Sequence, residues 1–242
     1  MPYATRLLVV LFLTVCAHAH AQNAEPAPVF SHYAWDTLLQ RYVDAKGRVN
    51  YRGFIGDRAA LQSYLDSLTA HPPQPDWQHN DRLAYWLNAY NAFTVALICD
   101  HYPLKSIRDL DKGKTWDVKR IPIGDKMYSL NDIENKIVRP EFKDARIHFA
   151  LNCAARSCPP LHNRAFTAEN LQGALTGRTR AFVNDPKSNA IGAEGIQLNK
   201  IFDWYAADFG DLYSFLKKYY RGQMPAEKTP ISYKEYDWRL NE

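Results

Sequence analysis

An almost wholly apolar segment from Leu83 to Ile98 constrains this chain more than any other part of its sequence. Apolar or aromatic residues at nearly every position predict a helix that is buried on all sides in the middle of a domain. Only Asn88, Asn91 and Thr94 interrupt the pattern, and their spacing of three places them on one helix face. Because an unpaired buried amide costs about 1–3 kcal/mol, this polar face needs partners. Either the amides bond to the backbone of a neighbouring loop, or they line a polar cleft.

Helical periodicity and capping residues predict further helices on both sides of this segment. We expect them at 31–42, 57–71, 130–138, 167–184, 199–209 and 211–220. Alternating or turn-flanked apolar residues predict strands or hairpins. We expect these at 47–51, 118–123 with 127–128, 147–151, 190–191 with 196–198, and 236–240. Helices and hairpins interleave without regular βαβ units, so the predicted fold class is α+β, with helices packed on a small mainly antiparallel sheet in a single domain.

The first residues predict export. Arg6 precedes an apolar run too short to span a bilayer, and Ala19-His20-Ala21 has the small-x-small pattern of a signal-peptidase site. We expect a signal peptide at 1–21, an N-terminal extension at 22–32 and the domain at 33–242. No later run is long enough for a membrane span, so a soluble periplasmic or secreted product is predicted.

Charge and motifs narrow the function classes. The formal net charge is +4, and basic residues alternate with acidic ones without forming a run with aromatics, which argues against nucleic acid as a partner. The sequence shows no phosphate-binding loop and no standard metal signature, so we expect no cofactor and no metal. A small molecule or a peptide stays as the expected substrate class, and the oligomeric state is left open.

Removal of the signal peptide would leave three cysteines: Cys99, Cys153 and Cys158. The last two flank a short loop, and an oxidising compartment favours a disulfide between them. Cys99 lies among apolar residues of the central helix, where we expect it to pack as a small buried thiol. An odd number of cysteines requires at least one thiol that is free or that pairs between chains.

Five motifs occur in an order that resembles the DUF547 family. They are Tyr85-Trp-Leu-Asn-Ala-Tyr-Asn91, Ser129-Leu-Asn-Asp-Ile-Glu134, Ile147-His-Phe-Ala-Leu-Asn-Cys153 with Ser157-Cys-Pro159, Ile201-Phe-Asp-Trp-Tyr205 with Asp208-Phe209, and Tyr236-Asp-Trp-Arg-Leu-Asn241. The resemblance runs from about Tyr33 to Asn241. It implies a single domain and membership of this family. It implies no activity, because the family is one of unknown function. The positions carried over are Asn88, Asn91, His148, Asn152, Cys153, Cys158 and Asp203.

Thiol chemistry is the sharpest hypothesis for a site. Cys153 would be the nucleophile, His148 its base or thiolate partner, and Asn152 would orient groups nearby, since a cysteine beside an imidazolium has a depressed pKa. In an extended strand, however, positions 148 and 153 face opposite sides. The order of His and Cys is also the reverse of that in papain-like enzymes. Asn88, Asn91, Cys158 and Asp203 are candidates to line the cleft.

Two other chemistries stay open. His148, Cys153, Cys158 and His162 are zinc-ligand types, although their spacing fits no standard zinc pattern. Asp203 and Asp208 could act as acid and base, with Glu134 as a partner from elsewhere.

Whether the chain is an enzyme therefore stays open between two hypotheses. The leading one is a thiol-dependent enzyme that uses Cys153 and His148 on a small molecule or peptide. The alternative is a non-catalytic envelope binding or interaction module in which a Cys153–Cys158 disulfide clamps the loop. A free, low-pKa Cys153 that shares a cleft with His148 would favour the enzyme.

Overall fold

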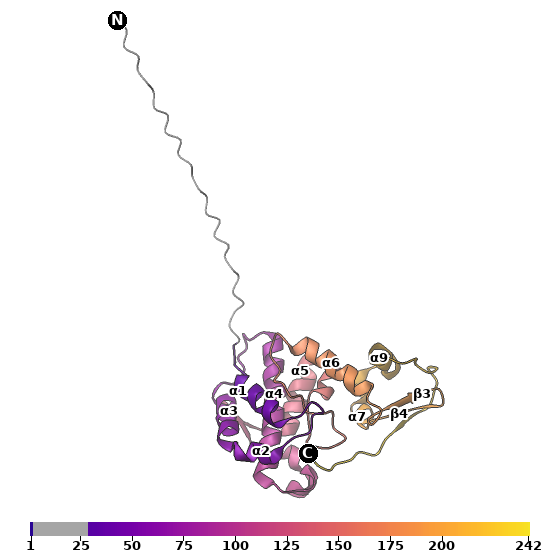
Figure 1. The fold of residues 1–242 in the computed structure, drawn as a ribbon, viewed down its shortest axis with the longest axis horizontal. Helices are drawn as coiled ribbons and strands as arrows, with labels where there is room; N and C mark the ends of the chain where they lie inside the picture. Colours follow the sequence, from indigo (N-terminus) through magenta and orange to yellow (C-terminus); the bar gives the residue numbers. More distant parts are fainter. Residues whose placement is uncertain (2–28) are drawn as a thin grey trace.

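The structure, a computed structural model, describes Met1 and residues 29–242 (Figure 1). The predicted signal peptide at 1–21 and most of the predicted extension at 22–32 lie outside the described residues. In the part of the chain that is described, no helix has the length and apolar character needed to cross a membrane.

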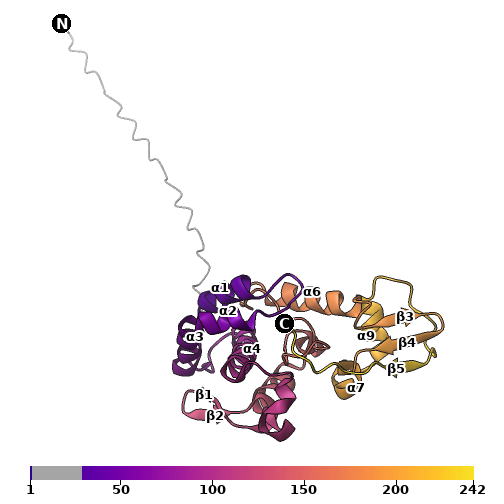
Figure 2. The same ribbon diagram turned by 60° about the horizontal axis from the view of Figure 1, so that its bottom comes forward.

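Helix α4 (His79–His101) is the centre of the larger lobe. Helices α1 (Tyr33–Tyr42), α2 (Tyr51–Gly56) and α3 (Arg58–Ala70) pack around it, so its apolar residues from Leu83 to Cys99 are almost all buried (Figure 2). Cys99 lies in this core, as predicted. The buried central helix expected from the sequence is confirmed.

The chain then turns through the 3-10 segments η1 (Ile107–Gly113) and η2 (Thr115–Asp117) into a hairpin of β1 (Ile121–Ile123) and β2 (Lys126–Tyr128). This hairpin was predicted. A π-helical segment, η3 (Asp132–Val138), leads directly into α5 (Arg139–Phe142). The hydroxyl of Ser129 accepts the Asp132 N–H while the Asp132 carboxylate accepts the Ser129 N–H. This reciprocal cap fixes where the helical segment begins.

The prediction of a strand at 147–151 is wrong. The 3-10 helix η4 (Ala145–Phe149) occupies most of that range. Asp144 caps it by accepting the Arg146 N–H on its side chain, and the Ile147 N–H donates to the Asp144 carbonyl. These local bonds satisfy the backbone without a partner strand, whereas a strand needs a neighbour to pair with. The alternation of apolar residues here reflects burial against two cores rather than an extended chain.

A smaller lobe follows helix α6 (Leu171–Val183). It contains β3 (Ala190–Gly192), β4 (Gly195–Leu198), α7 (Ile201–Trp204), α8 (Ala206–Phe209), α9 (Leu212–Tyr219) and β5 (Ile231–Tyr233). Strand β4 pairs with β3 antiparallel and with β5 parallel. A second apolar cluster, which includes Phe149, Phe182 and Phe202, forms the core of this lobe. The α+β class is confirmed, with two small, mainly antiparallel sheets in place of one.

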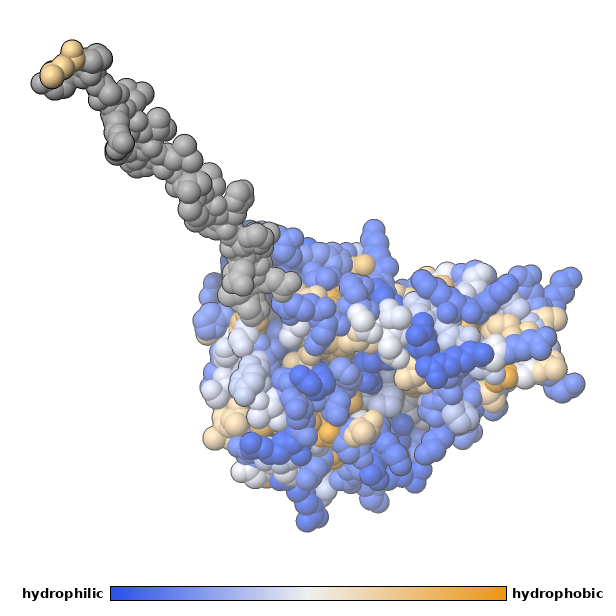
Figure 3. Space-filling view, turned by 45° about the horizontal axis from the view of Figure 1, so that its top comes forward, coloured by the Kyte–Doolittle hydropathy of each residue, from blue (hydrophilic) through white to orange (hydrophobic). Residues whose placement is uncertain are grey.

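The C-terminal segment (residues 234–242) returns from the smaller lobe to the larger one, and the chain ends beside the larger lobe in both views (Figures 1 and 2). The closing strand predicted at 236–240 does not form. Only Leu240 makes an isolated bridge, to Ala155. The segment is instead anchored by single hydrogen bonds to several loops. Hydrophilic residues cover most of the face shown in Figure 3.

Candidate functional site

A cavity of about 350 Å³ lies where the C-terminal segment and the smaller lobe meet the larger lobe. Residues able to do chemistry line part of it: Glu134, His148, Cys153 and Cys158. Aromatic side chains line much of the rest: Tyr90, Trp116, Trp204, Tyr205, Tyr236 and Trp238. A cavity of this size accommodates a small molecule or part of a peptide.

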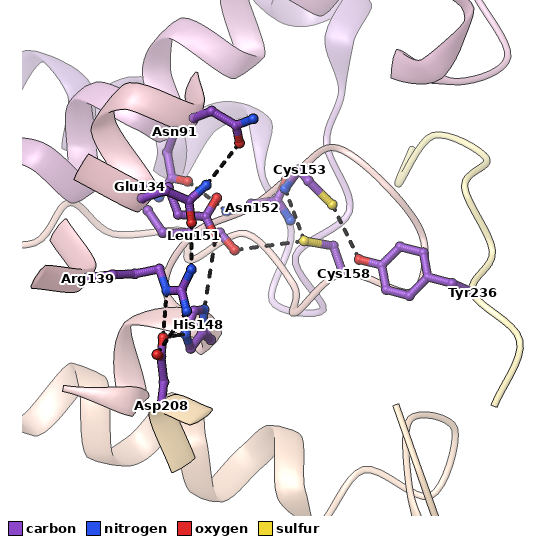
Figure 4. Close-up of polar contacts among 12 residues, drawn as sticks. Asn91, Glu134, Arg139, His148, Leu151, Asn152, Cys153, Cys158, Asp208 and Tyr236 are labelled. Carbon is purple, nitrogen blue, oxygen red and sulfur yellow. Dashed lines mark hydrogen bonds and ion pairs between the residues drawn. The ribbon is translucent and has the colours of Figure 1, made fainter. Parts of the chain in front are cut away.

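Cys153 and Cys158 are free thiols, so the predicted disulfide is not formed in the structure. The Cys153 N–H donates to the Cys158 sulfur across 3.0 Å, and the Tyr236 hydroxyl lies 3.3 Å from the Cys153 sulfur (Figure 4). The Cys158 sulfur also lies 3.8 Å from the Leu151 carbonyl, a second acceptor within reach of its one hydrogen. Cys158 is buried, whereas Cys153 is half-buried at the cavity wall.

This arrangement divides the two thiols into a donor and an acceptor. A hydrogen bond from Cys158 lowers the pKa of Cys153, and the Tyr236 hydroxyl adds to that effect while burial opposes it. Burial first, and then the neighbouring Cys153, raises the pKa of Cys158 well above its usual range. Cys158 therefore stays a protonated donor, and Cys153 is the thiol that ionises more readily.

Asn152 holds the loop that carries Cys153. Its side-chain oxygen accepts the Ala154 N–H at 3.0 Å and the Asn241 amide at 3.2 Å, while its own amide donates to the Pro159 carbonyl at 2.9 Å. These bonds fix Ala154 at φ 62°, a left-handed conformation that is strained for a residue with a Cβ. Asn152 is thus a positioning residue, because its side chain holds the backbone of the loop next to Cys153 by hydrogen bonds.

His148 is buried beside an ion pair between Asp208 and Arg139 (Figure 4). Its Nε2 lies 2.7 Å from the Asp208 carboxylate, and Arg139 holds that carboxylate with two bonds of 2.6 and 2.9 Å. The Arg139 bond, followed by that of His148, lowers the pKa of Asp208. The imidazole also stacks on the ring of Tyr205, with centroids 3.9 Å apart. Asp208 is therefore an ionised partner that fixes the orientation of the imidazole.

The other ring nitrogen of His148 faces Glu134. Nδ1 lies 4.0 Å from the Glu134 carboxylate, and Glu134 is buried. Burial raises the pKa of Glu134, an effect that hydrogen bonding to Tyr205 and the charge of Arg139 oppose. Burial lowers the pKa of His148 itself to about 4, although Asp208 works against this. The bonding pattern assigns the Nε2 proton to the Asp208 bond and leaves Nδ1 as a free base at neutral pH.

Cys153 and His148 line the same cavity, but no hydrogen bond joins them. The 3-10 turn at η4 removes the strand geometry that would have put them on opposite faces. His148 is neutral, so the structure has no imidazolium beside Cys153 at neutral pH. Cys158 and Tyr236 lower the pKa of Cys153, which is the role that the sequence had suggested for His148.

The asparagines of α4 satisfy backbone groups of neighbouring loops. Asn88 bonds both backbone groups of Phe166, at 2.7 and 3.1 Å. Asn91 donates to the Ala150 carbonyl and accepts the Asn152 N–H, both at 2.9 Å. Of the two alternatives for this face, the structure has the backbone-bonding one, and Asn91 thereby fixes the start of the Cys153 loop.

Asp203 lies outside the cavity wall, with 41% of its side chain exposed in an ion pair with Lys200. His162 faces a different hollow, beside Arg178. No group of three or more His, Cys, Asp or Glu side chains within Met1 and residues 29–242 is arranged to hold a metal ion.

Sequence reasoning undervalued the partners of His148. The sequence suggests Asp208 only as an acid or base paired with Asp203, and it singles out none of Arg139, Tyr205 and Tyr236 as a site residue. Asp208 and Tyr205 are separated from His148 by about sixty residues of sequence. The one available signal was that Tyr205 and Asp208 lie in the fourth of the five motifs and Tyr236 in the fifth, whereas Arg139 lies in none.

The fold and the cavity define an α+β protein with a thiol pair and a buried histidine–carboxylate pair in one site. A family model described as "Protein of unknown function, DUF547" matches residues 75–183, so the chain carries a DUF547 domain over that range. The match is shorter than the span of the five motifs. It includes Glu134, His148, Cys153 and Cys158, and it ends before Tyr205, Asp208 and Tyr236. Neither a curated protein nor a solved structure matches the chain.

Acid is expected to destabilise the fold between about pH 6.5 and about pH 4 because of its buried histidines. Burial lowers the pKa of His148 to about 4 and that of His32 to about 3, from 6.5. As pH falls below 6.5, the unfolded chain therefore gains protons before the native state does. The stabilisation is complete above about pH 6.5 and is lost through this window, by on the order of 3 kcal/mol for His148.

Denaturant unfolding at successive pH values measures this effect, with His148→Gln as the comparison. The variant should show a shallower loss of stability than the natural protein. Glu134 acts in the opposite direction, because a raised carboxyl pKa makes the native state gain protons first. Parallel curves for the two proteins would show that His148 does not remain neutral in the native state.

Proposed function

We propose that this protein is an exported enzyme in which the Cys153 thiolate attacks an electrophilic carbonyl of a small molecule or peptide. The observation that carries the proposal is the Cys153 thiol itself. It is free, it reaches the cavity, and two donors, Cys158 and Tyr236, lower its pKa. A thiolate held in this way is a nucleophile near neutral pH.

The proposed reaction has two steps. In the first, the Cys153 thiol loses its proton, and the thiolate adds to the carbonyl carbon. Water in the cavity takes up that proton and passes it to the leaving group as the carbonyl carbon–leaving group bond breaks, and a thioester on Cys153 remains. In the second, water attacks the thioester carbon and gives its proton to Nδ1 of His148. The carbon–sulfur bond then breaks, the acid product leaves, and the proton returns to the Cys153 sulfur.

The position of His148 suits the second step better than the first. His148 and Cys153 line the same cavity and no hydrogen bond joins them, so we place the attacking water of the second step between them. Asp208 holds Nε2, and this leaves Nδ1 directed to Glu134 and the cavity. Asp208 also stabilises the imidazolium that forms when His148 takes up the proton.

Export rests on the first residues of the sequence. We propose that residues 1–21 are removed and that the domain at 33–242 acts in the periplasm or outside the cell. N-terminal sequencing of protein purified from an exporting host tests this, with Gln22 as the expected first residue. A product that keeps Met1 would overturn the export proposal and leave the chemistry of the site unaffected.

The rival function is a non-catalytic binding module, which the aromatic cavity wall favours. A generic acyl donor, 4-nitrophenyl acetate, separates the two functions. We expect a burst of nitrophenol and a protein heavier by one acetyl group, with the label on Cys153. Cys153→Ser should abolish both, and Cys99→Ser, which alters a buried thiol in α4 outside the cavity, should retain both. Labelling at Cys99, or no burst in the reduced protein, would leave the binding module as the function.

A further inference from the structure

The aromatic wall of the cavity comes from three separate parts of the chain. Trp204 lies on α7, Tyr236 and Trp238 lie on the C-terminal segment, and Trp116 comes from η2 on the opposite side. The rings form one continuous cluster. The centroid of Trp204 lies 5.7 Å from that of Trp238 and 4.8 Å from that of Tyr236, and Trp116 meets Trp238 edge-on at 5.7 Å.

This wall is more exposed than folding alone explains. Trp204 is 46% exposed, although indole rings usually bury most of their surface. The exposed ring borders the same cavity as the Cys153 thiol. Tyr236 belongs to both features, because its hydroxyl contacts the Cys153 sulfur and its ring packs on Trp204 and Trp238. The wall therefore runs directly up to the reacting atom.

Apart from Lys114, the polar side chains around the cavity are largely engaged with other groups of the protein. Asn131 donates to Asp117 at 2.6 Å, His148 is bonded to Asp208, and Tyr205 is hydrogen-bonded to Glu134. A sugar ring would need several free donors and acceptors for its hydroxyls, whereas a flat apolar ring needs only the aromatic face. The cavity thus favours an aromatic ring as the occupant of this wall.

We infer that three residues of this wall, Trp204, Tyr236 and Trp238, bind an aromatic ring of the substrate, so that Cys153 acts on acyl compounds or peptides with an aromatic side chain beside the reacting carbonyl. This inference rests on the proposed function and adds the substrate class to it. Trp204 is the specificity-determining residue. The residues that carry this recognition lie outside the matched range 75–183, whereas the thiols and His148 lie inside it.

Binding to the Cys153→Ser protein tests the inference without turnover. The probes are N-acetyl-phenylalanine methyl ester and N-acetyl-alanine methyl ester, titrated by calorimetry, with N-acetylglucosamine as a sugar. We expect the phenylalanine ester to bind about tenfold more tightly than the alanine ester, from ring burial and aromatic packing. Trp204→Ala should remove this preference, and Trp204→Phe should retain most of it.

Trp77→Phe is the matched control, because Trp77 packs against Phe30 and Tyr85 far from the cavity wall, and it should leave the preference unchanged. Equal binding of the two esters, tighter binding of the sugar, or an unchanged preference in Trp204→Ala would overturn the inference. The acetylation of Cys153 is measured separately with 4-nitrophenyl acetate. Aromatic preference without that acetylation would refute the proposed enzyme while the aromatic subsite stood.

Discussion

Replacing Asp208 with asparagine is expected to slow hydrolysis of the acyl-enzyme by about 10²–10⁴-fold, the range by which positioned general bases contribute. Asp208 accepts the bond from Nε2 of His148 and raises the pKa of that imidazole against burial. Without the carboxylate, His148 loses its fixed orientation and becomes a weaker base. The formation of the acyl-enzyme should keep its rate, because Cys158 and Tyr236 stabilise the thiolate.

A pre-steady-state measurement with 4-nitrophenyl acetate separates the two steps. Asp208→Asn should retain the burst, while its steady-state rate should fall. The steady-state rate that remains should depend on an ionisation at lower pH than in the natural protein. Asp203→Asn is the matched control, since Asp203 lies nearby in sequence but pairs with Lys200 at the surface. Loss of the burst in Asp208→Asn, or an equal loss of rate in Asp203→Asn, would show that Asp208 does not act through His148 on the second step.

Removal of residues 236–242 is expected to destabilise the protein by about 5 kcal/mol or more and to slow alkylation of Cys153 at neutral pH. The C-terminal segment is hydrogen-bonded along the loop that carries the cysteines. Arg156 N–H donates to the Arg239 carbonyl at 2.8 Å, and Asn241 N–H donates to the Ala154 carbonyl at 3.1 Å. The deletion also removes the Tyr236 hydroxyl, one of the two donors to the Cys153 sulfur.

Two point variants separate the contribution of the C-terminal segment to stability from its effect on the pKa of Cys153. Asn241→Ala leaves the buried Tyr51 hydroxyl without its 2.7 Å acceptor and should cost about 1–3 kcal/mol. Tyr236→Phe should change stability little and raise the pKa of Cys153, measured by the pH dependence of iodoacetamide labelling. Removal of Glu242 alone, which bonds only the Tyr102 hydroxyl at the surface, is the control. Equal denaturation midpoints for the full chain and the chain without residues 236–242 would show that the C-terminal segment does not stabilise the packing of the two lobes.

The elements that were predicted correctly are those whose signals are local. The central helix could be inferred because an apolar run of that length fits only a buried helix, and α4 confirms it. The two hairpins at 121–128 and 190–198 follow short turns that local residues specify. The predictions at 147–151 and 236–240 failed because strand formation depends on a partner, and the chain provides none at 147–151 and only the single Ala155–Leu240 bridge at 236–240.

The sequence by itself determined the α+β class, the buried central helix, and the residue types of the site. Periodicity, capping and side-chain chemistry depend only on residues that are close together in the sequence. It also placed Cys153, Cys158 and His148 within one short segment. Only the tertiary structure decided which groups act on each of them. It joined both His148 and Arg139 to Asp208, and it brought Tyr236 to the Cys153 sulfur. Such contacts link residues sixty or more positions apart, and they depend on how the two lobes and the C-terminal segment pack together.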